Sequence, residues 1–408
     1  MPRFEPFIGI RYDTASLDPA LVTAPPYDVI SPTDRAALVA SAPANVVRID
    51  LPIDGTDPYG DAARQFAQWR SDGVLVDDPQ PSFTVYRMDA ADENGVVRHT
   101  TGVIGAMELT RPGEGDILPH EFTTPKAKSD RLDLLRSTRS NLSAVWGLSP
   151  ARGLTALLDT TEDPLCRFEA DGVTHSVWRI TDTARIDAIR TAIGSAPIVI
   201  ADGHHRYETS LAYRDERRAS DGDGGAADAV MTFVVELVED ELDVGPIHRL
   251  LSALPDGFDL LEAFEPFFDI EAFVFTDAPT VRRLQELGGL VLVVPEGAWL
   301  LRPRPETIAA TRDLDSSRLD LALASLPDHA LVYQHGVEHI RAAVDSGAAQ
   351  AGVLLRPVTI DQIIAIAEGG EKMPPKSTFF APKPRTGVVF RSIDYPRRQR
   401  RAEAAAIT

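Results

Sequence analysis

Short apolar runs alternate with helix-like patterns along much of the chain. Residues 198–201 (Ile-Val-Ile-Ala) form a continuous apolar run of strand length, and residues 231–238, which are mostly apolar, are expected to form a second strand. Uninterrupted runs of this kind are typical of strands that are buried on both faces of a sheet. Later in the chain, the apolar run 290–294 is followed by helical patterns at 337–344 and 360–368. This alternation favours an α/β fold, with a mixed α+β arrangement as the alternative.

The first third of the chain carries signals for a hairpin and for two capped helices. Residues 83–87 and 96–108 are extended in pattern and flank Asp-Glu-Asn-Gly at 92–95. Asn-Gly between extended runs predicts a β-hairpin, so the sheets should be mixed. Ser31 and Asp57 each precede a proline and a helical pattern, and both are therefore expected to cap a helix N-terminus.

Length and composition add coarse limits on the organisation of the chain. A chain of 408 residues with 44% hydrophobic and 25% charged residues can bury a substantial core. We expect an N-terminal α/β segment with the hairpin (1–110), a central segment (111–250), a C-terminal α/β segment (251–394) and a flexible tail (395–408). One compact body is the alternative to these divisions.

Charge, apolar run lengths and cysteine content restrict the classes of partner. The net charge of −20 disfavours binding to nucleic acid, and no run approaches the roughly 18 apolar residues of a membrane helix. The first six residues contain a charge and prolines where a secretory signal requires an apolar run, and Cys166 is the only cysteine. We therefore expect a cytoplasmic protein with a small-molecule substrate and neither a nucleic-acid nor a membrane partner. The oligomeric state stays open.

The segment with the densest chemistry follows the apolar run at 198–201. It reads Asp202-Gly203-His204-His205-Arg206, where a strand should end, a glycine should allow a tight turn and a helix should begin. Helix N-termini attract anions, and arginine suits phosphate, so this pattern predicts a small-molecule phosphate site. Asp202 could bind Mg²⁺ or accept a proton, and the histidines could carry protons. The plainer interpretation has Asp202 capping the helix, one histidine filling a polar gap and Arg206 pairing with Glu208 or another acid.

Three further segments display groups suited to a site. His120 and Glu121 precede a run of bases and acids, which fits either a catalytic or metal-binding role or a capped helix with a solvated face. A proline-rich stretch at 373–384 presents cations and hydroxyls, from Lys376, Ser377, Thr378 and Lys383. A rigid turn at 24–30 presents the aromatic hydroxyl of Tyr27 and the carboxylate of Asp28. Either segment could line a site for a phosphorylated ligand. The alternative for 373–384 is a packing strand with surface lysines, and the alternative for 24–30 is a well-capped bend.

Five ordered blocks resemble the bacterial and archaeal family named domain of unknown function 1015. The blocks are Ala24-Pro25-Pro26-Tyr27-Asp28-Val29-Ile30, Asn45-Val46-Val47-Arg48, Leu118-Pro119-His120-Glu121, Asp202-Gly203-His204-His205-Arg206-Tyr207-Glu208-Thr209 and Met373-Pro374-Pro375-Lys376-Ser377-Thr378. The resemblance spans about Arg3 to Arg391 and implies no activity by itself.

The turn after the strand is also similar, over about ten residues, to the phosphate-binding signature of the ParB and sulfiredoxin superfamily. That superfamily includes free L-serine kinases with an Asp-Gly-His-x-Arg motif, matched here by Asp202, Gly203, His204 and Arg206. The resemblance implies that the turn amides, His204 and Arg206 hold the transferring phosphate, while Asp202 supports the metal or the substrate hydroxyl. His204 stands in the place of the sulfiredoxin cysteine, so sulfinic-acid repair is not expected.

These observations lead to a Mg²⁺-dependent phosphotransferase that acts on a small hydroxylated metabolite, with L-serine as the first candidate. ATP, ADP or pyrophosphate could be the phosphoryl donor. Glu121 or Asp202 could act as the base and as a metal ligand, and Lys376 or Lys383 could supply positive charge. One alternative is a hydrolase whose transition metal is held by His204, His205, Glu208, His120 and Glu121. Another is a nucleotide or phosphometabolite sensor without turnover.

Overall fold

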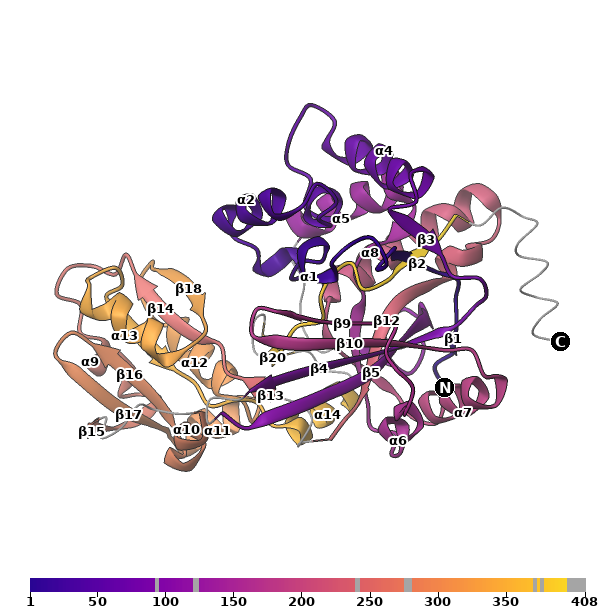
Figure 1. Ribbon diagram of the computed structural model, residues 1–408. Coiled ribbons are helices and arrows are strands. Elements are labelled where there is room, and N and C mark those ends of the chain that lie inside the picture. Colours follow the sequence, from indigo (N-terminus) through magenta and orange to yellow (C-terminus); the bar gives the residue numbers. More distant parts are fainter. Residues whose placement is uncertain are drawn as a thin grey trace. The chain divides into compact units, whose positions relative to one another are not determined.

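The computed structural model describes residues 1–91, 95–119, 125–238, 243–274, 281–369, 373–374 and 378–394. The chain folds as two compact units (Figure 1). The first unit comprises residues 1–119, 123–242 and 382–408, and the second comprises 120–122 and 243–381. This division differs from the three consecutive segments expected from the sequence. Segments 1–110 and 111–250 share one sheet, and the chain returns to the first unit after residue 381.

The first unit is built on a mixed nine-stranded sheet. Along its main path the order is β6-β11-β8-β12-β5-β4-β10-β9, and β1 pairs with β5. Strand β11 runs parallel to β6 and antiparallel to β8, while β12 runs parallel to β8. The strands are β1 (Phe4–Glu5), β4 (Phe83–Ala91), β5 (Val97–Glu108), β6 (Ile117–Pro119), β8 (Val145–Ser149), β9 (Cys166–Ala170), β10 (Val173–Ile180), β11 (Ile198–Asp202) and β12 (Ala229–Glu236).

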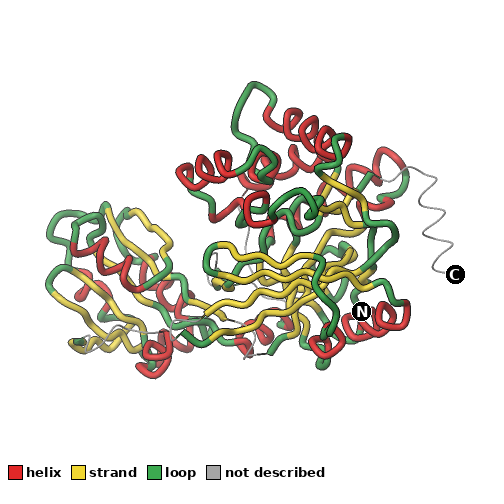
Figure 2. The backbone as a smooth tube through the Cα atoms, viewed as in Figure 1, coloured by secondary structure: helices red, strands yellow, loops and turns green. Residues whose placement is uncertain are grey.

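The expected hairpin and the expected α/β class are confirmed. Strands β4 and β5 pair antiparallel from Thr84 opposite Ile104 to Ala91 opposite Val97. In the first unit, helices lie on both sides of the large sheet (Figure 2). Helices α6 (Leu154–Leu158) and α7 (Thr183–Gly194) pack on one side through an apolar core that includes Ile189 and Ile198.

A second layer of the first unit is formed around a small sheet. Its order is β3-β2-β21-β7, from β2 (Gly9–Tyr12), β3 (Leu75–Asp77), β7 (Ser140–Asn141) and β21 (Phe390–Ser392). Tyr12, Phe66, Trp69 and Phe390 pack together in its core. The helices of this unit are otherwise α1 (Pro19–Val22), η1 (Tyr27–Val29), α2 (Pro32–Ser41), α3 (Val47–Asp50), α4 (Pro58–Ser71), α5 (Pro125–Thr138), α8 (His204–Asp221) and η2 (Gly225–Asp228).

The two predicted N-caps are present. Ser31 accepts a hydrogen bond from Asp34 N, and the Asp34 side chain accepts one from Ser31 N, which completes a capping box. Asp57 accepts from Gly60 N at the start of α4. Because both caps precede a proline at the first helical position, local chemistry alone sets where these helices begin.

The second unit has its own antiparallel sheet, of order β15-β17-β16-β19-β14-β18. Its strands are β14 (His248–Ser252), β15 (Phe268–Phe273), β16 (Leu290–Val294), β17 (Gly297–Pro303), β18 (Ala330–Gln334) and β19 (Ala351–Leu354), with β13 (Asp243–Gly245) and β20 (Phe379–Ala381) paired separately. Its helices are α9 (Leu260–Phe264), α10 (Val281–Leu287), α11 (Pro305–Ala310), α12 (Asp315–Leu323), α13 (Val337–Asp345) and α14 (Ile360–Glu368). Among the described residues of both units, we find no helix with the length and apolar character needed to cross a bilayer.

Candidate functional site

The strand, turn and helix predicted at Asp202 to Arg206 are present in the first unit. Strand β11 ends at Asp202, and helix α8 begins at His204. The first intrahelical hydrogen bond joins Tyr207 N to Gly203 O at 2.9 Å. The preceding amides at the helix N-terminus have no acceptor within the helix, so they can bind an anion at this end.

Gly203 is required at the turn for two reasons. Its φ of +87° lies in the left-handed region, where residues with a side chain are strained. A Cβ at this position would also lie 2.9 Å from Arg206 Nε and 3.0 Å from Arg206 Cζ. The glycine therefore makes room for the Arg206 guanidinium to fold back over the turn.

Asp202 lies between two cations. Arg206 Nη2 donates to Asp202 Oδ2 at 2.5 Å, and Lys383 Nζ donates to Asp202 Oδ1. The Arg206 and Asp202 side chains are only 10% and 16% exposed, so this pair is largely screened from water. Arg206 Nη1 also donates to the carbonyl oxygen of Ala144, on the loop before β8. The motif thus forms a buried ion-pair cluster rather than a row of solvated side chains.

The two cations control the ionisation of Asp202. Burial opposes the charged carboxylate, but Lys383 and Arg206 outweigh that effect and hold the pKa of Asp202 well below its usual range. For Arg206, burial likewise opposes the charge, while the Asp202 carboxylate outweighs it and raises the pKa of the guanidinium. Asp202 is consequently a permanent anion at neutral pH and a weak proton acceptor.

Tyr27 and Asp28, on the short helix η1, belong to the same cluster. Lys383 Nζ lies 3.9 Å from Asp28 Oδ2, so one ammonium group faces the carboxylates of both Asp28 and Asp202. The Tyr27 ring lies 4.1 Å from Cζ of Arg131, a cation–π contact. Burial raises the pKa of Tyr27 to about 12, so its hydroxyl stays protonated at neutral pH. The structure therefore brings four of the expected residues, Tyr27, Asp28, Asp202 and Lys383, to the same place as Arg206.

Two residues that were not assigned to the site from the sequence complete this cluster. Arg131, on α5, donates to the Asp50 carbonyl oxygen at 2.6 Å and lies 3.5 Å from Asp50 Oδ1. Asp50 ends helix α3 and is 3% exposed; burial raises its pKa, and Arg131 opposes that effect. The signal in the sequence was the Asn45 block five residues earlier, because the Asn45 side chain accepts from Val47 N and fixes the start of α3.

A small cavity of about 50 Å³ lies beside the cluster, and Asp50, Arg131 and Arg206 line it. Thr209 and Ser210, on the second turn of α8, complete its polar wall. Within the part of the chain that the structure describes, Arg206 Nε and Thr209 Oγ1 are buried without a hydrogen-bond partner. Buried polar atoms of this kind normally have a partner, so the cavity offers donors for a water or a ligand atom.

The remaining expected residues do not all join this cluster. His204 is buried beside Asp202, and its electrostatic interaction with Asp202 helps to lower the pKa of that carboxyl. His205 is half-buried. Thr378 is described and belongs to the second unit. His120, Glu121, Lys376 and Ser377 lie outside the described residues.

The structure modifies two of the expectations for the motif. Asp202 does not cap α8, because the N-cap residue is Gly203 and no side chain makes a capping hydrogen bond there. Arg206 pairs with an acid, as the plainer interpretation expected, but the partner is Asp202 of the motif itself. In the described ranges no group of three or more histidine, cysteine or acidic side chains is placed to hold a metal ion, and the hydrolase model therefore depends on His120 and Glu121.

Comparison with protein families identifies the chain by its sequence. The model of the family described as "Protein of unknown function (DUF1015)" matches residues 4–321. The chain belongs to the DUF1015 family. The matched region contains the turn at Asp202, and the family description assigns no activity to this DUF1015 protein. No curated protein matches it.

Several solved structures are distantly similar to this DUF1015 protein. A free serine kinase in complex with AMP is 13% identical, with a TM-score of 0.36 over 65% of this chain and 84% of the kinase. SbnI with a C-terminal truncation, from Staphylococcus aureus, is 10% identical, with a TM-score of 0.40 over 72% of this chain and 94% of that chain. A conserved hypothetical protein from Pyrococcus furiosus is 12% identical, with a TM-score of 0.35 over 65% and 87% of the two chains.

Proposed function

We propose that the first unit of this DUF1015 protein is a phosphotransferase that acts on a small hydroxylated metabolite. The observation that supports this most is the arrangement of Arg206, Lys383 and the N-terminus of α8 around Asp202 at the end of β11. Free L-serine is the first acceptor to test, and ATP, ADP and pyrophosphate are the candidate donors.

Arg206 and Lys383 would supply the positive charge that phosphoryl transfer requires. Charge spreads over the equatorial oxygens of the transferring group in the transition state, and fixed cations stabilise it. Both cations are held in place by Asp202, and Arg206 is held in addition by the Ala144 carbonyl. An incoming phosphate competes with Asp202 for Lys383 and meets cations that are already oriented.

Asp50 is a better candidate than Asp202 for the group that accepts the hydroxyl proton. In the proposed step the acceptor oxygen attacks the terminal phosphorus, the bond to the leaving phosphate group breaks, and the hydroxyl proton passes to a carboxylate. Efficient general bases have a pKa raised toward neutral pH. The pKa of Asp202 is lowered, whereas burial raises that of Asp50, which lines the cavity beside Arg206.

Mg²⁺ fits this site through the carboxylates of Asp28 and Asp202. Magnesium is usually held by one or two carboxylates together with the phosphates of the substrate, so a dedicated cluster of protein ligands is not required. Asp28 and Asp202 both face Lys383 Nζ, so their oxygens already share one cationic partner. When bound there, the ion would neutralise phosphate charge.

The test is a phosphoryl-transfer assay with the purified full chain, Mg²⁺, each of the three donors, and L-serine beside a panel of small alcohols and amino acids, read by mass spectrometry. We expect a phosphorylated product whose formation is lost in Arg206→Ala and retained in Arg64→Ala, since Arg64 is an exposed residue that pairs with Asp57 and Asp61. If no donor is consumed, the kinase proposal is wrong. Bound zinc or manganese would then favour the hydrolase, and stabilisation by nucleotide without product would favour the sensor.

A further inference from the structure

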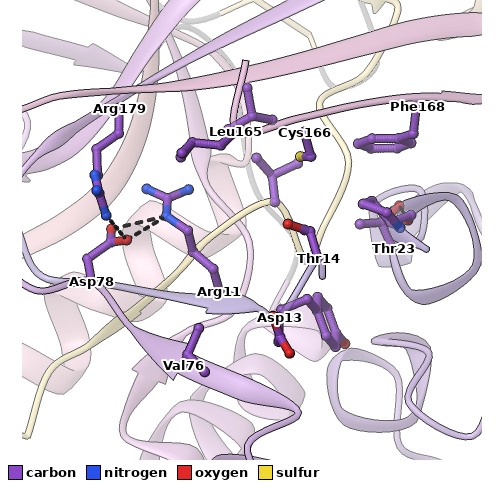
Figure 3. Close-up of a pocket in the computed structure, with 15 residues that line it drawn as sticks. Arg11, Asp13, Thr14, Thr23, Val76, Asp78, Leu165, Cys166, Phe168 and Arg179 are labelled. Carbon is purple, nitrogen blue, oxygen red and sulfur yellow. Dashed lines mark hydrogen bonds and ion pairs between the residues drawn. The ribbon is translucent and has the colours of Figure 1, made fainter. Parts of the chain in front are cut away.

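A second cavity of the first unit, separate from the cluster at Asp202, has a charged end and apolar walls. It measures about 190 Å³ and lies among β2, β3, β9 and β10 (Figure 3). Arg11, Asp78 and Arg179 form the charged end, and Leu165, Phe168 and Val177 contribute to the apolar walls. Pockets that combine apolar walls with a few fixed polar groups are typical sites for small molecules.

Arg11 is held rigidly but keeps one donor unused. Its Nε donates to both oxygens of Asp78 at 3.0 and 3.1 Å, and its Nη2 donates to Thr84 Oγ1 at 2.5 Å. Its Nη1 is buried and has no hydrogen-bond partner among the residues that the structure describes. A guanidinium fixed at two points, with its third donor group unsatisfied, is oriented to receive an acceptor from a ligand.

The charges at this end of the cavity do not balance. Asp78 also accepts from Arg179 Nη1 at 2.9 Å, so two guanidinium groups share one carboxylate that is 5% exposed. Gly9 makes this approach possible, because a Cβ there would lie 2.5 Å from Asp78 Oδ2. Two positive charges therefore meet one negative charge within the Arg11–Asp78–Arg179 group, while Asp13 carries the second negative charge of the cavity lining.

Two other lining residues narrow the chemistry of the ligand. Asp13 lines the cavity, where its carboxylate accepts from the Ser16 hydroxyl at 2.7 Å, and its charge disfavours a dianion such as a phosphate ester. Burial raises the pKa of the Cys166 thiol to about 11, so this side chain is a neutral wall at pH 7 rather than a nucleophile. The cavity therefore suits one carboxylate and a short apolar body.

We propose that this cavity binds a small monocarboxylic acid with a branched apolar body, whose carboxylate pairs with Arg11 Nη1 and Arg179. The site does not depend on the proposed phosphotransferase activity, because none of its lining residues belongs to the cluster at Asp202. A carboxylate that carries an α-ammonium group could gain a second contact at Asp13, while its 2-oxo relative could not. Comparing the affinities of the amino acid and of its 2-oxo relative therefore shows which of the two classes of carboxylate the cavity prefers.

The experiment is isothermal titration calorimetry of the full chain with isovalerate, α-ketoisovalerate, L-valine, neutral isovaleramide and inorganic phosphate. We expect at least one of the three carboxylates to bind with Kd of about 1 mM or tighter, and isovaleramide and phosphate to bind at least about tenfold more weakly. Arg11→Met should abolish carboxylate binding. Leu165→Asp should weaken it at least about tenfold by adding a negative charge at the wall. Leu165 is 45% exposed, so we expect this variant to fold.

Ile53→Asp is the matched control, because Ile53 is exposed and does not line the cavity. It should leave the affinity unchanged, and circular dichroism should show that all three variants are folded. The proposal is wrong if no carboxylate binds to the folded wild-type chain, if phosphate binds more tightly than the carboxylates, or if Leu165→Asp binds them as tightly as Ile53→Asp does.

Discussion

Lys383 donates a hydrogen bond to Asp202 across 181 residues of sequence. Most of the intervening chain after Leu242 forms the second unit, and Lys383 lies in the segment that returns to the first. The contact joins the strand-turn-helix motif to the proline-rich segment 382–384, so two motifs that are distant in the sequence form one electrostatic cluster. This contact also makes the ionisation of Asp202 depend on a residue far outside its own motif.

Lys383→Met should reduce the stability of the first unit at neutral pH by about 1–3 kcal/mol, because Asp202 keeps Arg206 but loses the ammonium group that pairs with its other oxygen. A carboxyl group with a lowered folded pKa stabilises the fold above its ordinary pKa of about 3.9, and this contribution is lost as the pH falls below that value. The free energy of unfolding should therefore decrease less for the variant than for the wild type when the pH is lowered from neutral to strongly acidic. Urea denaturation as a function of pH measures both effects, and Arg64→Met, at an exposed pair, is the control.

Gly203→Ala should destabilise the chain more than Gly153→Ala does. Both glycines are N-cap residues with nearly equal positive φ, +87° and +89°. A Cβ at 153 meets nothing within 4 Å, whereas one at 203 meets Arg206 at 2.9 Å. We expect a loss of about 1–2 kcal/mol for Gly153→Ala from backbone strain alone, and about 2–4 kcal/mol for Gly203→Ala. If urea denaturation gives equal losses of unfolding free energy for the two variants, Gly203 is not needed to accommodate the Arg206 side chain.

His175 should make the first unit less stable as the pH falls from about 6.5 to about 4. Burial lowers the pKa of His175 to about 4, against an ordinary value of about 6.5. Between these values the unfolded chain binds more protons than the folded chain, so stability decreases as the pH decreases, by at most about 3 kcal/mol. His175→Phe removes the titrating group and should flatten this part of the pH profile. The Tyr86 hydroxyl lies 2.8 Å from His175 Nδ1 and would lose this partner at every pH. That loss lowers the free energy of unfolding by the same amount across the pH range and does not change its pH dependence.

Local patterns in the sequence were sufficient to predict elements but not their partners. The strand at 198–201, the hairpin around residues 92–95 and the caps at Ser31 and Asp57 depend on neighbouring residues, and each was predicted correctly. The pairing of β12 with both β5 and β8 depends on contacts between distant segments, which periodicity does not encode. For that reason the expected division near residue 110 falls inside a sheet.

The candidate site shows the same limit. Asp202, Gly203 and Arg206 were found from the sequence because they are adjacent and chemically dense. Asp50 was not, because the nearby Asn45 block indicates where α3 begins but not that the aspartate at its end is buried beside two arginines. Its burial next to Arg131 and Arg206 results from the packing of α3, α5 and α8, which the sequence pattern does not specify.

Asp50→Asn tests the proposed base in the phosphoryl-transfer reaction. If Asp50 accepts the hydroxyl proton, kcat should fall by about 10²–10⁴-fold, because asparagine cannot take up a proton. Activity of the wild type should decrease as the pH falls through the pKa of Asp50, which burial raises above its ordinary value, and the variant's residual rate should lack this decrease. Asp130→Asn is the matched control: Asp130 pairs with the same Arg131, and hydrogen bonds from Tyr59 and Arg131 outweigh its burial and lower its pKa. A variant at residue 50 that keeps both kcat and the acidic limb of the pH profile would show that Asp50 only positions Arg131.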